Sequence, residues 1–303
     1  MSVAERVTPW DPAARHRFVT SDGTALHVVE EGVPDAEQTL VLVHGWTLDH
    51  TSWDPVVAAL ADTPVRIVRY DHRGHGGSAP APDGTATVEQ AADDLAELLT
   101  DRVRGRVVLV GHSMGGMTLM ALAQRHPALF TDRAAAVGLI ATSCGGMSEL
   151  TLGLPDWLAK RVAAVERRMN SRIARHRRKA LLTRPKLALP ALRWLLFGSG
   201  ARKADVLATA VQVGRCHPAS MAGFRRSIDE HERRETLAAL RDLPVVVLAG
   251  GADRLTPLPH ARAIAAELPA AELVIYPAAG HMLTYERDQD VAMRLAGLVK
   301  TTH

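Results

Sequence analysis

The sequence predicts an α/β fold with a mostly parallel central sheet and helices on both of its faces. Short, continuously apolar runs rich in β-branched residues alternate with longer segments in which apolar residues recur at helical spacing. Continuous apolarity indicates strands buried on both faces, and strands that alternate with helices form a doubly wound sheet. The six apolar runs are residues 39–43, 66–70, 106–110, 137–141, 245–249 and 273–276.

An antiparallel hairpin is expected to precede these runs. Residues 16–20 and 25–30 have an extended pattern, and Ser21-Asp22-Gly23-Thr24 between them has a composition typical of hairpin turns. Between the predicted strands, residues 88–102 and 114–126 carry apolar side chains at helical spacing. These two segments are the clearest predicted helices.

The alternation of strands and helices breaks between residues 144 and 236. This segment contains helix-like stretches but no convincing buried strand. We therefore predict one core domain, formed by residues 1–143 and 237–303, and an inserted helical cap (lid) of residues 144–236. The apolar stripe of the expected cap helix is formed by Leu158, Val162, Val165, Met169 and Ile173, which are three or four residues apart.

Charge is distributed unevenly along the chain. The formal net charge is +3, yet residues 160–203 contain fourteen Lys or Arg and one acid, Glu166. This basic block can be a solvated helix face, a complement to an acidic body, or a surface for an anionic lipid or a phosphorylated substrate. The first two interpretations are favoured. A separate reading as a nucleic-acid surface is set aside, because we find no nucleic-acid-binding module and expect no nucleic-acid partner.

Composition excludes several classes of protein. With 303 residues and 47% hydrophobic residues, the chain has enough apolar side chains for a large folded core. No apolar run approaches the roughly 20 residues of a membrane helix, and residues 1–22 lack the apolar core of a signal peptide. We therefore expect a cytoplasmic protein whose two cysteines, Cys144 and Cys216, are free thiols.

A pentapeptide of the form G-x-S-x-G joins the predicted strand 106–110 to the predicted helix 114–126. It reads Gly111-His112-Ser113-Met114-Gly115. In a nucleophile elbow, the serine occupies a strained position on a sharp strand-to-helix turn, and only small residues can flank it. The start of the helix would stabilise negative charge that develops near the Ser113 oxygen. Such a pentapeptide also arises by chance. A catalytic role for Ser113 therefore depends on whether the sequence also offers a base and an acid.

A serine nucleophile needs a base, and the base needs a group that orients it. Asp253 follows the predicted strand 245–249 in a glycine-rich loop, and His281 follows the predicted strand 273–276 beside a glycine. The order Ser113, Asp253, His281 is the one expected for this elbow. Alternatively, Asp253 caps the helix that follows it and His281 is an ordinary loop residue. Because all three follow strand ends, we predict a catalytic triad.

With these residues in place, the chain resembles the α/β-hydrolase superfamily, in particular its esterase, lipase and cofactor-free haloperoxidase-like branch. The resemblance extends over residues 17–299. It includes Val43-His44-Gly45-Trp46, Trp53 and the run from Tyr70 to Ser78. It implies the α/β-hydrolase fold and an oxyanion hole made by the backbone N–H groups of Trp46 and Met114.

The resemblance also bears on the histidines. A metal site could be suspected from His44, His72, His75 and His112, because histidine is a common ligand. These residues lie on loops that the resemblance explains as structural, and there is no H-E-x-x-H pair. We expect no metal and no cofactor. Asp71 is expected to belong to a turn at the sheet edge that Arg73 braces.

The predicted activity is hydrolysis of a carboxylic ester, a lactone or a thioester through an acyl-enzyme on Ser113. Relatives that open epoxides or remove halides have aspartate at the elbow, and relatives that cleave carbon–carbon bonds have a more glycine-rich oxyanion loop. Two alternatives stay open. One is a perhydrolase or haloperoxidase-like activity, and the other is a non-catalytic ligand-binding protein on a hydrolase scaffold.

Substrate choice is expected to depend on the cap. The apolar residues of residues 144–236 favour a small-molecule ester with an apolar portion. The alternative is that these side chains only fix the cap to the core. The candidate substrate-binding residues are Trp46, Trp157, Leu158 and Trp194.

Overall fold

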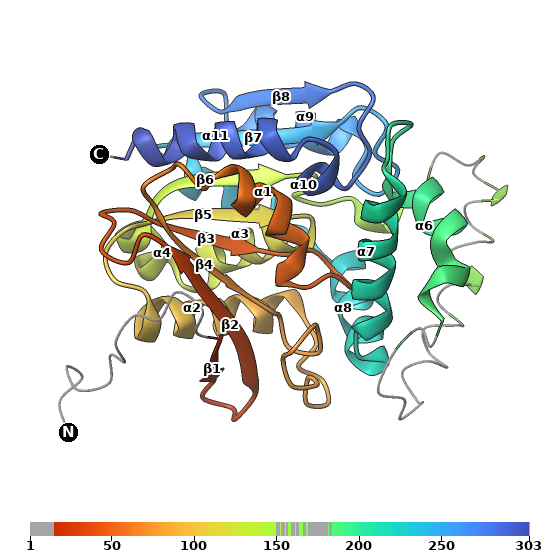
Figure 1. Cartoon of the computed structure of the whole chain (residues 1–303), viewed down its shortest axis with the longest axis horizontal. Coiled ribbons are helices and arrows are strands. Elements are labelled where there is room, and N and C mark those ends of the chain that lie inside the picture. Colours follow the sequence, from red (N-terminus) through yellow and green to blue (C-terminus); the bar gives the residue numbers. More distant parts are fainter. Residues whose placement is uncertain are drawn as a thin grey trace.

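An eight-stranded sheet forms the centre of the protein, with the strand order β1-β2-β4-β3-β5-β6-β7-β8 (Figure 1). The computed structural model describes residues 15–149 and 184–302, together with Leu152, Pro155, Trp157, Leu158, Arg161, Ala164, Val165, Arg168 and Leu181. The strands are β1 (Arg15–Val19), β2 (Ala25–Gly32), β3 (Thr39–Val43), β4 (Arg66–Tyr70), β5 (Val107–His112), β6 (Ala134–Ile140), β7 (Val245–Gly250) and β8 (Glu272–Tyr276).

Strand pairing confirms the predicted topology. Strands β4, β3, β5, β6, β7 and β8 are parallel, while β1 and β2 form the expected antiparallel hairpin, and β2 pairs antiparallel with β4. Strands β3, β5, β6 and β7 are buried along their whole length. Strand β8 departs from the expected burial on both faces, because it is an edge strand and its residues are exposed or half-buried.

Helices cover both faces of the sheet. Helices α2 (Val88–Arg102), α3 (Met114–Arg125) and α9 (Leu258–Glu267) contribute to one apolar cluster, and α1 (Asp54–Ala59) and α11 (Asp288–Lys300) contribute to the other. Strand β3 shows the division directly, since Val41 and Val43 belong to the first cluster and Leu40 and Leu42 to the second. The shorter helices are α4 (Pro127–Arg133), α10 (Leu283–Glu286), η2 (His50–Trp53) and η5 (Glu235–Leu240).

The segment between β6 and β7 contains residues 144–236, which we call the insert. Its described residues form η3 (Met147–Glu149), η4 (Pro185–Ala188), α6 (Leu189–Leu196), α7 (Lys203–Arg215) and α8 (Pro218–Asp229), and none of them is in a strand. Figure 1 shows α6, α7 and α8 at one end of the sheet. The expected boundary at residue 236 falls inside η5.

The expected cap helix can be compared only in part. Leu158 is half-buried and the side chain of Val165 is 63% exposed. Val162, Met169 and Ile173 lie outside the described residues, as does much of the basic block. Over the part of the chain that is described, every helix is too short or too polar to span a membrane. Cys144 and Cys216 are both buried free thiols.

A buried ion pair joins the hairpin, the loop after β4 and α2. The Arg73 guanidinium is fully buried and donates from Nε to Asp94 Oδ2 at 2.8 Å and from Nη1 to Asp22 Oδ2 at 2.8 Å. A buried charge is tolerated only when it is paired and hydrogen-bonded. Arg73 therefore braces the turn through Asp94 and Asp22 and not through Asp71.

Replacing Asp94 is expected to destabilise the fold strongly, because it leaves the Arg73 charge buried without its main partner. Asp94→Ala should lower the free energy of unfolding by about 3–5 kcal/mol. The neighbouring Asp93→Ala is the matched control, since the Asp93–Arg125 pair is partly exposed, and it should cost less than about 1 kcal/mol. Urea denaturation of both variants measures this, and equal losses would contradict the role of Arg73.

Candidate active site

Ser113 lies between the last residue of β5 and the first residue of α3, in a backbone conformation that side chains rarely adopt. Its φ is 54° and its ψ is −119°. Surrounding bonds hold this strained turn, because Ser113 N–H donates to Ile140 O at 2.9 Å and Thr142 Oγ1 donates to Ser113 O at 2.7 Å. Strain of this kind costs about 1–3 kcal/mol and is concentrated at functional sites.

Close backbone contacts explain why glycines flank Ser113. A Cβ at Gly111 would lie 2.3 Å from Gly116 N, and a Cβ at Gly115 would lie 2.2 Å from Val43 O. Real Cβ atoms are not found at such distances from backbone atoms. The elbow therefore packs directly on the end of β3, as the G-x-S-x-G pattern predicts.

Asp253 and His281 are in direct contact. Asp253 lies in the loop after β7 and His281 in the loop after β8, and His281 Nδ1 lies 2.8 Å from Asp253 Oδ2. Both side chains are buried. The other contacts of Asp253 are donors, namely Leu255 N at 2.8 Å and Thr256 N at 3.0 Å to Oδ1, and Thr256 Oγ1 at 2.7 Å to Oδ2.

These contacts determine the charge of Asp253. Burial alone would raise the pKa of its carboxyl, but the neighbouring His281 and the Thr256 hydrogen bonds outweigh burial and lower the pKa below its usual value. An ionised Asp253 accepts a hydrogen bond from His281, so the proton of the neutral imidazole resides on Nδ1. Nε2 is then the nitrogen available as a base.

The His281 loop packs against the residue that precedes Ser113. His112 Nε2 donates to His281 O at 2.9 Å, and the two imidazole rings are 4.9 Å apart. Among the described residues, Ser113 Oγ has no hydrogen-bond partner, so no hydrogen bond joins it to His281 in this structure. In free enzymes such bonds are often long and tighten only when substrate binds. The structure thus brings Asp253 and His281 together and places the His281 loop beside the elbow.

The predicted oxyanion residues border Ser113 from two sides. Met114 N–H is at the start of α3, and a Cβ added to Gly45, which precedes Trp46, would lie 3.1 Å from Ser113 Cβ. Within the described parts of the chain, neither Met114 N–H nor Trp46 N–H has a hydrogen-bond acceptor. Two unpaired backbone donors beside a serine suit an oxyanion.

The candidate substrate-binding residues differ in their surroundings. Trp46 is half-buried, and its indole Nε1 donates to Met221 O of the insert at 3.0 Å. The side chain of Trp194 is 47% exposed and packs under the guanidinium of Arg254, 4.9 Å from the ring centroid. The side chain of Trp157 is 64% exposed, and Leu158 is half-buried. Of these four, Trp46 is the residue whose neighbour Gly45 lies against Ser113. Substrate-binding roles for all four residues stay predictions.

The four histidines singled out in the sequence are fully buried at this edge of the sheet. His44, His72 and His75 lie in loops as expected, but the expectation is wrong for His112, which is the last residue of β5 because pairing with β6 extends that strand. His72 N–H donates to His44 Nε2 at 3.0 Å, and Thr47 N–H donates to His75 Nε2 at 3.1 Å. Burial lowers the pKa of His75 to about 4 and of His72 and His112 to about 3, and it lowers the pKa of His44 well below its usual value. These neutral rings act as hydrogen-bond partners for loop backbone.

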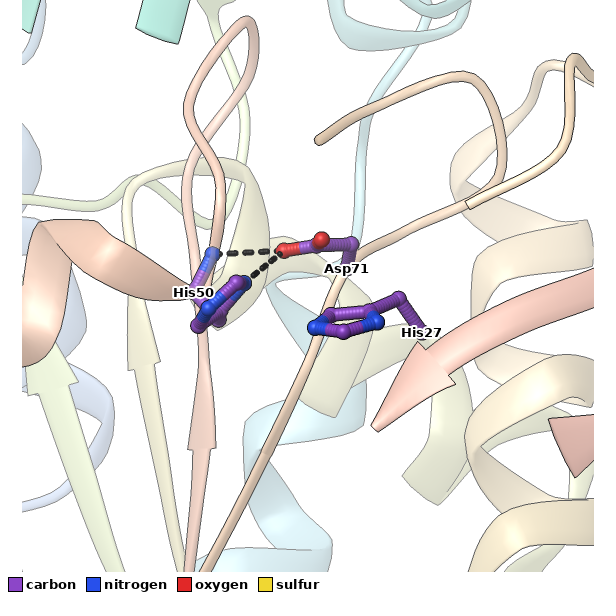
Figure 2. A group of neighbouring side chains, drawn as sticks. All are labelled: His27, His50 and Asp71. Carbon is purple, nitrogen blue, oxygen red and sulfur yellow. Dashed lines mark hydrogen bonds and ion pairs between the residues drawn. The ribbon is translucent and has the colours of Figure 1, made fainter. Parts of the chain in front are cut away.

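Figure 2 shows a different group, His27, His50 and Asp71. Sequence spacing did not reveal it, because His27 is in β2, His50 in η2 and Asp71 in the loop after β4. One ligand atom from each lies within 4.8 Å of the others. Asp71 is already engaged, since Oδ1 accepts from His50 N at 2.6 Å and His50 Nδ1 at 2.8 Å, and Oδ2 accepts from Gly77 N at 2.8 Å. Through these bonds Asp71 holds the segment at His50 and the loop at Gly77 together, which accounts for the group without a metal ion.

Comparisons with known proteins bear on the family and the fold of the chain. A sequence model of the Alpha/beta hydrolase family matches residues 40–294. The chain is 31% identical over 265 residues to "Putative carbamate hydrolase RutD" from Caulobacter sp. (strain K31), covering 88% of this chain and 91% of that protein. It is 38% identical over 107 residues to "Non-heme chloroperoxidase CPO-A1" from Kitasatospora aureofaciens, covering 35% of this chain and only 38% of that protein.

One solved structure is similar over nearly the whole chain. It is a thermophilic esterase from Thermogutta terrifontis, with a TM-score of 0.77 and 26% sequence identity, and the match covers 96% of this chain and 100% of the esterase. The similarity therefore includes the sheet, the helices and the region of the insert.

The buried histidines predict a loss of stability in acid. Their pKa values in the folded protein lie below the usual 6.5, so the unfolded chain binds more protons below pH 6.5. For His75, stability falls as the pH drops from 6.5 towards 4, by about 2 kcal/mol between pH 7 and pH 5. Urea unfolding at both values measures it, with His75→Gln expected to show a shallower pH dependence. Equal midpoints at pH 7 and pH 5 would contradict this assignment.

Proposed function

Because the chain belongs to the alpha/beta hydrolase family, we propose that it is a serine hydrolase that cleaves a carboxylic ester, with Ser113 as nucleophile, His281 as general base and Asp253 as the orienting acid. The observation that carries the proposal is the 2.8 Å contact between buried Asp253 and His281, beside a serine held at φ 54°. Lactones and thioesters react by the same route and belong to the proposed substrate class.

The proposed reaction has two halves. His281 Nε2 takes the Ser113 hydroxyl proton while Ser113 Oγ bonds to the ester carbonyl carbon, and the resulting oxyanion is stabilised by Trp46 N–H and Met114 N–H. The carbon–oxygen bond to the alcohol then breaks, and the alcohol leaves with the proton from His281. Water, deprotonated by His281, attacks the acyl-enzyme, and the acid is released as Ser113 regains its proton.

We further propose that the insert acts as a cap over this site and contributes its apolar wall. Support comes from Trp46, which lies in the loop after β3. Its indole N–H donates to the backbone carbonyl of the insert residue Met221. A second contact comes from α6, whose Leu196 O accepts from His281 N–H at 2.8 Å. The insert thereby reaches both the oxyanion loop and the loop of the base.

A second candidate is perhydrolysis, in which hydrogen peroxide replaces water as the acceptor of the acyl group. It is favoured by the similarity to a non-heme chloroperoxidase, which covers 35% of this chain. A non-catalytic ligand-binding role is the remaining rival, and it is disfavoured by the ionised Asp253 and the strained Ser113, which binding alone does not require.

Removal of the serine hydroxyl tests the enzyme assignment. Ser113→Ala should lower kcat on short p-nitrophenyl esters by about 10⁴-fold or more, because the nucleophile and base act as a unit. Ser199→Ala, at an exposed position of the insert, is the control and should retain the wild-type rate. An organophosphonate should form one adduct, on Ser113. Undiminished turnover by Ser113→Ala, or no adduct, would rule out the proposed function.

Acceptor choice is tested on one acyl ester with and without peroxide. We expect acid to form faster than peracid at equal acceptor concentration, since hydrolysis is the proposed activity. Faster peracid formation would favour the perhydrolase candidate instead. Both products should disappear in Ser113→Ala, because both arise from the same acyl-enzyme.

A further inference from the structure

The loop that contains His281 is bonded to the insert as well as to the sheet. The carbonyl of Leu196, the last residue of α6, accepts from His281 N–H at 2.8 Å and from Met282 N–H at 3.2 Å. Leu196 is buried. A carbonyl at the end of a helix has no partner within the helix and needs one outside it. The end of α6 thus depends on the His281 loop, and the loop depends on α6.

Glu286, at the end of α10, makes a second bond between the same two segments. Its Oε1 accepts from Gly280 N–H at 2.9 Å, next to His281, and its Oε2 accepts from Gly198 N–H at 2.8 Å, two residues after Leu196. A single carboxylate therefore joins the loop of the base to the insert. Charge-assisted bonds to backbone N–H groups are stronger than neutral ones.

The two glycines allow this bridge because their backbones touch. A Cβ at Gly198 would lie 2.0 Å from Ala278 O, and a Cβ at Gly280 would lie 2.6 Å from Gly198 N. No side chain fits between the segments. By contrast, Gly200 has nothing within 4 Å of its Cβ position, so the contact is local to Gly198.

Apolar side chains also join the insert and the His281 loop to the oxyanion loop. Leu48, three residues after Gly45, packs in one cluster with Leu196 and Phe197 of the insert and with Met282 and Tyr285 beside the His281 loop. This cluster is separate from the two that cover the sheet. The insert, the oxyanion loop and the base loop thus share one small core.

Helix α7 of the insert also contacts α10, through the side chain of Gln212. Gln212 Nε2 donates to Tyr285 Oη at 2.7 Å and to Thr51 Oγ1 at 3.0 Å. Tyr285 precedes Glu286 in α10. The insert therefore contacts α10 at two successive residues, through α7 at Tyr285 and through Gly198 at Glu286.

We propose that Glu286 is a positioning residue through which the insert sets the place of His281, so that displacement of the insert moves the base relative to Ser113. We call the Gly198–Glu286–Gly280 bridge the latch. The proposal rests on the proposed function, since it assigns a consequence to the position of His281. A displacement of the base by about 1 Å can lower a rate about 100-fold, so the latch makes catalysis depend on a seated insert.

The first test removes the carboxylate. Glu286→Gln keeps one acceptor oxygen but turns an amide NH₂ towards the other N–H, and Glu286→Asp is too short to reach both glycines. Both variants should lower kcat by about 10- to 100-fold with KM changed by less than about twofold, because the base moves and the acyl pocket does not. Glu267→Gln, which breaks ion pairs with Arg234 and Arg241, is the control and should match wild type.

Wild-type kcat in Glu286→Gln or in Glu286→Asp would overturn the latch. Wild-type kcat in Glu286→Gln would show that catalysis requires neither the carboxylate charge nor both hydrogen bonds. Wild-type kcat in Glu286→Asp would show that catalysis does not require a side chain long enough to reach both glycines. A rise in KM with unchanged kcat would also overturn it, since that pattern places Glu286 in substrate binding and not in the positioning of the base.

The second test separates the insert side of the latch from the loop side. Gly198→Ala forces the insert away from Ala278 O and from Glu286 Oε2, which would lie 2.0 Å and 3.0 Å from the new Cβ, while the Glu286 carboxylate is retained. Gly200→Ala adds the same methyl group in open space. Gly198→Ala should lower kcat about 10-fold or more, and Gly200→Ala should stay within about twofold of wild type. Equal kcat values for the two variants would overturn the coupling to the insert.

Hydrogen exchange of backbone amides tests the latch without the reaction. The amides of Gly198, Gly280 and His281 should be protected in wild type and should exchange faster in Glu286→Gln, whereas amides of β5 should not change. Unchanged exchange at Gly198 and Gly280 would overturn the latch even if esters are substrates. Faster exchange together with no Ser113 adduct in wild type would leave the latch standing and overturn the proposed function.

Discussion

The turn at Ser113 is the constraint on which the rest of the structure depends. A serine at φ 54° directly after a buried strand survives only where neighbouring segments hold both of its peptide groups. Ile140 O and Thr142 Oγ1 supply those bonds from the end of β6, and the end of β3 lies in contact with Gly115. Three adjacent parallel strands must therefore be in register before the serine is presented.

The buried Arg73 and the buried histidines hold the loops around Ser113 in different ways. Arg73 is fully paired and holds the loop after β4 against α2 and the hairpin. The neutral rings of His44 and His75 accept backbone hydrogen bonds in the loops that frame Trp46. His281 is buried and has the Asp253 carboxylate at Nδ1, which keeps Nε2 available as a base.

The insert also supports the loops around Ser113. Its α6 ends on the His281 loop and its α8 accepts a hydrogen bond from the Trp46 indole. A segment that supplies substrate contacts can also support catalytic geometry, because helix ends require partners and the base loop offers backbone N–H groups. Under the proposed function, the acyl pocket and the base would respond together when the insert moves.

Local sequence alone determined the strands, the two helices α2 and α3, and the elbow itself. Continuous apolar runs specify strands, and β3 and β4 have the predicted bounds. Burial on both faces depends also on the place in the sheet, since β8 is an edge strand and is not fully buried. The order of Ser113, Asp253 and His281 at strand ends likewise follows from the chain, since parallel strands end at one edge of the sheet. Strand β5 continues to His112, two residues beyond its predicted end, because pairing with β6 extends it.

Only the tertiary structure decided the contacts between distant segments. Glu286 lies 88 residues from Gly198, and Asp71 lies 21 residues from His50 and on another element, so neither pair has a periodic signal in the sequence. The bond from Leu255 N–H to Asp253 Oδ1, two residues earlier, does have a local signal, because aspartate side chains commonly bond backbone at that spacing. Pairings across a fold depend on how loops pack, and packing becomes defined only when the strands and helices have come together.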